Sequence, residues 1–115
     1  MEKRITNAII KMIDTEYPNG LARKRFSGGS TNNVGEPDIT ASVCGIRVEI
    51  EVKQPGQKPG KLQLSRLRRL QRNGCIAFWS DSKQDAKAKL DQALLKWRLN
   101  GLKAYLVGLS GDLAE

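Results

Sequence analysis

Three side chains in the middle of the chain have the chemistry of a hydrolytic site. They are Asp38, then Glu51 after twelve intervening residues, and Lys53 two residues later. Carboxylate oxygens, with a backbone carbonyl and water, are the ligands that Mg²⁺ prefers, and a nearby ammonium can stabilise charge that develops on a phosphate. The chain has no histidine, which argues against zinc and excludes His-dependent triads and nucleases. These residue types predict metal-dependent hydrolysis of a phosphodiester.

The segment 37–53 has the pattern needed to bring these side chains together. Polar and apolar residues alternate on both sides of Cys44-Gly45, which is typical of a β-hairpin with a two-residue turn. That turn places Asp38 directly opposite Glu51 on one face, with Lys53 two residues along the same face. A slip of one residue would destroy this arrangement. On the other face the turn predicts three apolar pairs: Val43 with Ile46, Ala41 with Val48, and Ile39 with Ile50.

Two carboxylates held this close repel each other unless a cation lies between them or one of them takes a proton. A divalent metal removes the conflict. The alternative is a solvated strand face on which Glu and Lys alternate for solubility, and this alternative would suffice for Glu51-x-Lys53 alone. The position of Asp38 across the turn favours the metal site.

The rest of the chain predicts short elements separated by glycine and proline, without repeats. A strand, a helix and a second strand in succession over 75–107 predict a parallel crossover. We therefore expect an α/β protein with helices on both faces of the sheet. The expected elements are a helix with an apolar stripe from Ile5 to Ile13 that ends before Tyr17, a strand at Leu21–Phe26, a glycine-rich loop at Ser27–Asn33, a helix at Lys61–Arg72, a strand within Gly74–Trp79, a helix at Ser82–Leu99 that ends at Asn100-Gly101, and a strand at Lys103–Val107.

Length and charge narrow the class of protein. A chain of 115 residues predicts a single domain over 1–115. The start of the chain lacks the pattern of a signal peptide and no apolar run is long enough to span a membrane, so we expect a soluble intracellular protein. Cys44 and Cys75 stand alone, and reduced thiols are the default. A net charge of +8 favours a polyanion such as nucleic acid as the partner, although basic solvated surfaces are common.

The cations are concentrated in the segment 58–72, which contains six of them and no acid, whereas four of the twelve acids lie in 36–51. No interleaved aromatic residues form a stacking platform, so recognition should be of backbone and shape. Each cation taken singly is also explained as a solvated side chain. The candidate nucleic-acid-binding residues are Arg23, Lys24, Arg25, Lys58, Lys61, Arg66, Arg68, Arg69 and Arg72.

The order of these motifs resembles a known family. Gly35-Glu36-Pro37-Asp38, followed after twelve residues by Glu51-Val52-Lys53, is similar to the PD-(D/E)XK nuclease superfamily, and most closely to its VRR-NUC branch, the virus-type replication-repair nucleases. The resemblance spans most of the chain. It also includes Glu2 at the start of the first helix, the passage Arg25–Gly29, Gln63 in the helix after the Glu-Val-Lys strand, and the segment Gly74–Trp79.

The resemblance implies a restriction-endonuclease-like core with a central mixed sheet, and a DNA endonuclease that depends on Mg²⁺ or Mn²⁺. The metal ligands would be Asp38, Glu51 and the carbonyl of Val52, and Lys53 would be the catalytic lysine. Stand-alone domains of this kind in phage and bacteria resemble structure-selective enzymes that cut branched DNA such as Holliday junctions as homodimers. The expected location is therefore the cytoplasm of a bacterial or phage-infected cell.

Two further catalytic candidates, Glu2 and Gln63, lie on inward-facing helix positions. Glu2 shares the apolar stripe of its helix, where an unpaired carboxylate is costly unless it faces a polar site. The alternative is an ordinary first-turn acid favoured by the helix dipole. Gln63 precedes Leu67 and Leu70 on one helix face and would lie near the metal site, or it would serve as an N-terminal capping residue.

Two other functions stay open from the sequence alone. A small basic nucleic-acid-binding protein with the same fold and no catalysis would also explain the charge. RNA as the substrate is disfavoured only by the family resemblance.

Overall fold

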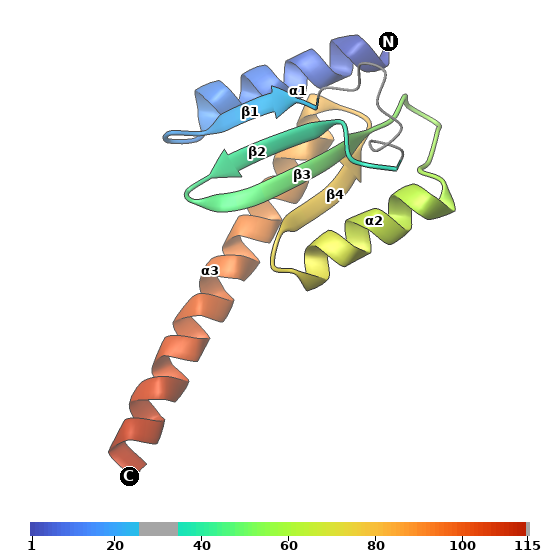
Figure 1. Ribbon diagram of the computed structural model, residues 1–115. Coiled ribbons are helices and arrows are strands. Elements are labelled where there is room, and N and C mark those ends of the chain that lie inside the picture. Colours follow the sequence, from blue (N-terminus) through green and yellow to red (C-terminus); the bar gives the residue numbers. More distant parts are fainter. Residues whose placement is uncertain (26–34, 115) are drawn as a thin grey trace.

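A computed structural model describes residues 1–25 and 35–114, and for residues 103–105 and 107–114 it describes the course of the backbone only. The described chain combines three helices with one four-stranded mixed sheet (Figure 1). The predicted α/β class, with a mixed sheet like that of the PD-(D/E)XK core, is therefore confirmed. The predicted loop at Ser27–Asn33 lies outside the described residues.

Helix α1, Glu2–Glu16, forms because its apolar residues recur every three to four positions and leave one stripe to bury. Ile9 and Ile13 of this stripe are fully buried against the sheet. The helix ends at Tyr17, whose backbone is extended as is usual before a proline. The predicted first helix is confirmed.

Strands β2, Ile39–Val43, and β3, Ile46–Val52, form the predicted hairpin. Cys44 and Gly45 both have positive φ angles, 54° and 79°, as a two-residue type I′ turn requires. The register is the predicted one, with Val43 paired to Ile46, Ala41 to Val48, and Ile39 to Ile50.

The sheet has the strand order β1-β2-β3-β4. Strand β1, Leu21–Lys24, pairs antiparallel with β2, whereas β4, Ile76–Ser80, pairs parallel with β3. A parallel neighbour requires a crossover, and helix α2, Lys61–Arg72, supplies it. The bounds of α2 are those predicted from the sequence.

Helices cover both faces of the sheet, as predicted (Figure 1). The even-numbered residues of β3, such as Ile50, join the apolar core with α1 and helix α3, Lys83–Ala114. Because side chains alternate along a strand, Glu49 and Glu51 lie on the opposite face, where α2 packs. The sheet is therefore apolar on one face and carries acids on the other.

The C-terminal part of the sequence prediction is wrong. Helix α3 does not end at Asn100-Gly101 but continues as one helix of 32 residues, so the strand expected at Lys103–Val107 and its crossover are absent. A single glycine costs a helix only about 1 kcal/mol, and the Leu, Lys and Ala residues around Gly101 are strong helix formers. The start of α3 is as predicted, because the Ser82 hydroxyl accepts a hydrogen bond from the Asp85 N–H at 3.0 Å.

No helix in the described part of the chain is both long enough and apolar enough to cross a bilayer.

Candidate active site

The hairpin brings Asp38 to the end of β3, beside Glu51. The last pair of the β2–β3 ladder is Ile39 with Ile50, so Asp38 and Glu51 lie just beyond the ladder. The Asp38 carboxylate accepts a hydrogen bond from the N–H of Val52 at 2.8 Å. The backbone of Asp38 is fixed as well, because its carbonyl accepts the N–H of Arg25 at 2.7 Å. Asp38 is therefore held on both sides, because its backbone carbonyl accepts from Arg25 and its carboxylate accepts from Val52.

The two carboxyl groups are close enough to perturb each other. Glu51 is only 3% exposed, and burial, together with the charge of Asp38 and a hydrogen bond to it, raises the pKa of Glu51 to about 8. The nearby charge of Lys53 acts in the opposite direction and lowers this pKa. A buried acid next to a second acid is the apposition that the hairpin register predicted.

Lys53 and Gln63 both converge on the same oxygen of Glu51. The Lys53 Nζ lies 3.8 Å from Oε1 of Glu51, and the Lys53 side chain is 18% exposed. The Gln63 amide donates to Oε1 at 3.0 Å, while its own oxygen accepts the N–H of Gly60 at 2.9 Å. Gln63 thus combines the two roles that the sequence left as alternatives, a capping residue of α2 and a contact to the site.

Glu2, in the first turn of α1, also lies near this group. Its side chain is half-buried, and its charge contributes to the raised pKa of Glu51. The structure therefore brings together four of the candidate catalytic side chains, Asp38, Glu51, Lys53 and Gln63, and places Glu2 near enough for its charge to act on Glu51.

The donor set at this site fits a hard divalent cation such as Mg²⁺ or Mn²⁺. Asp38 and Glu51 are in contact, and the raised pKa of Glu51 means that it retains a proton near neutral pH. A divalent cation in place of that proton would neutralise the repulsion between the two carboxylates. The Val52 carbonyl lies beyond the last pair of the β2–β3 ladder and would add a third oxygen. No cluster of three or more Cys, Asp or Glu side chains suited to a metal occurs in the described ranges. Water would therefore complete the coordination of an ion held by Asp38, Glu51 and this carbonyl.

Glu49 is a functional candidate that the sequence analysis missed. From the sequence it has no role beyond its place among the four acids of segment 36–51, yet it is 0% exposed, on the face of the sheet where α2 packs. Its Oε1 forms ion pairs with Arg25 and Arg47, while Oε2 has no hydrogen-bond partner among the described residues. The signal in the sequence was the apolar stripe of α2, which required a sheet face to cover.

Arg25 is bound inward and is not free for a partner. Besides its ion pair with Glu49, its Nε donates to the carbonyl of Pro37 at 2.9 Å. Arg25 therefore fixes the chain just before Asp38. Arg66 forms an ion pair with Glu36 at 3.7 Å and is half-buried. The other predicted nucleic-acid-binding residues are exposed: Arg23, Lys24, Lys58, Lys61, Arg68, Arg69 and Arg72.

A basic pocket of about 350 Å³ lies between α2 and β3. Arg47, Arg66 and Arg69 line it, together with Asn73 and Glu36. Arg47 precedes Glu51 by four residues on the same face of β3, a separation of about 13 Å along the strand. The pocket and the carboxyl groups therefore lie on the same side of the sheet.

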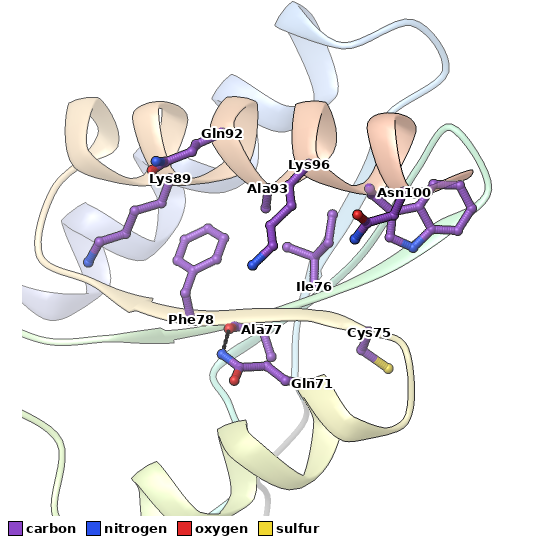
Figure 2. Close-up of a pocket in the computed structure, with 11 residues that line it drawn as sticks. Gln71, Cys75, Ile76, Ala77, Phe78, Lys89, Gln92, Ala93, Lys96 and Asn100 are labelled. Carbon is purple, nitrogen blue, oxygen red and sulfur yellow. Dashed lines mark hydrogen bonds between the residues drawn. The ribbon is translucent and has the colours of Figure 1, made fainter. Parts of the chain in front are cut away.

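A larger groove, of about 620 Å³, follows β4 between α2 and α3 (Figure 2). Among the residues that the structure describes, no carboxylate lines it. Two carbonyls at the outer edge of the strand are capped by side chains, because Gln71 donates to that of Ala77 and Lys89 to that of Trp79, each at 2.7 Å. Such capping protects an edge strand from pairing with another chain.

The fold and this site define an α/β domain with two carboxylates, a lysine and a glutamine at the polar end of its central hairpin. Solved structures of the same fold are described as a "VRR_NUC domain" and a "VRR_NUC domain protein". The first is 24% identical with a TM-score of 0.63, and the match covers 78% of this chain and 94% of that one. The second is 15% identical with a TM-score of 0.60, and the match covers 79% and 85%. These matches confirm the predicted resemblance to VRR-NUC domains in fold. No protein-family model and no curated protein matches the sequence.

Proposed function

We propose that this chain is a metal-dependent endodeoxyribonuclease. The observation that carries the proposal is the convergence of Asp38, Glu51 and Lys53 at one end of the hairpin, in a chain whose fold is that of solved VRR_NUC domains. A structural role alone does not explain this group, because two carboxyl groups in contact destabilise a hairpin.

Each residue of the site has a separate proposed role. Asp38 and Glu51, with the carbonyl of Val52, would hold Mg²⁺ or Mn²⁺, and such an ion supplies Lewis-acid polarisation of the phosphate and activation of water. Lys53 provides a positive charge that stabilises the negative charge developing on the scissile phosphate. Gln63 keeps Oε1 of Glu51 in place, and Glu2 adds negative charge that favours a cation in the site.

The proposed substrate is DNA, and branched duplex such as a Holliday junction is the preferred form implied by the VRR-NUC resemblance. The net charge of +8 and the exposed cations of α2 support binding to a polyanion. A phosphate in the basic pocket would lie about 13 Å from Glu51, equivalent to about four base-pair steps of 3.4 Å. The backbone contacts there would therefore orient the duplex without reading its sequence.

The test is a cleavage assay with the full chain on four-way junctions, flaps, linear duplexes, single strands and RNA. We expect cutting of DNA with Mg²⁺ or Mn²⁺, none in EDTA, and recovery when the metal is returned. Binding of DNA without cutting under any metal would contradict the proposal and indicate a basic nucleic-acid-binding protein. Preferential cutting of RNA would overturn the assignment of the substrate.

Arg69 provides a test of the path of the DNA. We expect Arg69→Ala to weaken binding of all duplexes alike and to reduce the slope of log K against log salt by about 1, because one phosphate contact is lost. Fluorescence anisotropy across a salt series measures this. Lys11→Ala, which removes an exposed cation from α1 on the other face of the sheet, is the matched control. Equal slopes for the two variants would place the DNA elsewhere.

A further inference from the structure

The distal half of α3 projects away from the body of the molecule (Figure 1). Up to Leu90 the helix packs into the core, where Ala86 and Leu90 are fully buried. Beyond this point four leucines, Leu95, Leu99, Leu102 and Leu106, are 58%, 55%, 53% and 52% exposed. The helix therefore carries large apolar side chains where the described chain does not cover them.

These leucines form a single seam. They follow one another at intervals of four, three and four residues, the spacing that keeps side chains on one side of a helix and that defines a coiled-coil repeat. In the sequence the same spacing continues to Leu109 and Leu113. The seam appears only beyond Leu94, because the proximal part of α3 directs different positions towards the sheet.

A helix of this composition needs a partner. Most of the stability of a helix in a protein comes from packing of its apolar face, and each glycine costs about 1 kcal/mol relative to alanine. The distal half contains Gly101, and by sequence also Gly108 and Gly111. Apolar packing along the seam would compensate for this weakness.

The surface of the chain supports a partner of substantial size. The chain exposes 7946 Å², whereas a compact monomer of 12.8 kDa exposes about 6,300 Å². Its radius of gyration is 16.2 Å, compared with about 13 Å for a compact chain of this length. An elongated chain of this kind leaves room for an interface of the roughly 800 Å² that a standard contact removes from each partner.

We propose that the leucine seam pairs two copies of this chain through an antiparallel contact between their α3 helices. A seam of one residue type is self-complementary, as a two-fold interface requires. The distal half begins with the cations Lys96 and Arg98 and ends, in the sequence, with Asp112, so antiparallel pairing brings unlike charges together. This pairing gives the homodimer implied by the VRR-NUC resemblance a defined surface.

A groove at the base of the seam fits this arrangement. It has a volume of about 470 Å³ and lies between the β2–β3 turn, at Cys44 and Ile46, and α3. Leu95 and Leu102 line it, so groove and seam form one continuous surface. In an antiparallel pair the tip of the partner's helix points towards this groove.

The test is the solution mass of the full chain by light scattering coupled to gel filtration, which is independent of any nuclease activity. We expect twice the 12.8 kDa chain mass for the wild type at micromolar concentration, and the single-chain mass for Leu99→Glu. Asn100→Glu places the same charge one residue away from the seam and should remain dimeric. Leu99→Ala, a milder change, should weaken the dimer while circular dichroism shows an intact fold.

A wild type that stays monomeric at all concentrations would overturn the proposal. Dimers that persist in both Leu99→Glu and Leu102→Glu would overturn it as well, because the interface would then lie elsewhere.

Discussion

Replacement of Lys53 by alanine is expected to reduce DNA cleavage by about 10²- to 10³-fold, the usual cost of losing one electrostatic contact to a transition state. The Lys53 Nζ lies 3.8 Å from the Glu51 carboxylate at the end of β3, and under the proposed function it would lie beside the phosphate that is cut. Binding of DNA should change less than twofold, because the exposed cations of α2 remain. Single-turnover cleavage and anisotropy measurements on the same junction separate the two effects.

The pH dependence distinguishes catalysis by Lys53 from a structural role. The charge of Lys53 lowers the pKa of Glu51, so the residual activity of Lys53→Ala should need a higher pH than that of the wild type. Lys83→Ala, which removes an exposed lysine at the start of α3, serves as the control and should cleave normally. Full activity in Lys53→Ala would refute the assigned role.

The central hairpin could be predicted because its information is local. Period-two alternation and the two-residue turn at Cys44-Gly45 fix the register, and the register alone brings Asp38 to Glu51. A register error would have exposed the apolar face, so few alternatives competed. The placement of the two carboxyl groups therefore follows from the two-residue turn.

Burial on the second face of the sheet could not be predicted in the same way. Glu49 and Arg47 alternate like solvated strand residues, yet Glu49 is removed from water on the face where α2 packs, and it pairs there with Arg25 and Arg47. Arg25 was assigned to DNA because it is a cation near a glycine-rich segment, yet it pairs with Glu49. These contacts join residues up to 24 positions apart, and no local pattern specifies them.

The error at the end of the chain has a different cause. Asn100-Gly101 is a good helix terminator in sequence, but its effect of about 1 kcal/mol is small enough for the context to decide. The sequence pattern after it predicts a last strand at Lys103–Val107, which includes Leu106. In α3, Leu106 instead belongs to a helical seam of exposed leucines, whose partner the local sequence does not specify.

Replacement of Glu51 by glutamine should remove metal binding and also change how stability depends on pH. In the metal-free protein the pKa of Glu51 is raised from 4.5 to about 8, chiefly by burial. Between these values the folded protein keeps a proton that the unfolded chain releases, so the free energy of unfolding falls as the pH rises from about 4.5 to 8. In Glu51→Gln the side chain is uncharged at every pH and has nearly the same shape as the protonated glutamic acid. We expect it to match the wild type at pH 4 and to exceed it at pH 9 by on the order of 3 kcal/mol.

Urea denaturation in EDTA at the two pH values measures this difference, and Glu16→Gln, an exposed acid on α1, is the control. Addition of Mg²⁺ should stabilise the wild type and not Glu51→Gln, since only the ionised carboxyl group binds the cation. This stabilisation should grow as the pH rises towards 8, because below that value the metal must displace the proton. A wild type and a Glu51→Gln variant with parallel pH profiles would show that Glu51 is already ionised in the folded protein, and the argument that the site is built for a cation would lose its basis.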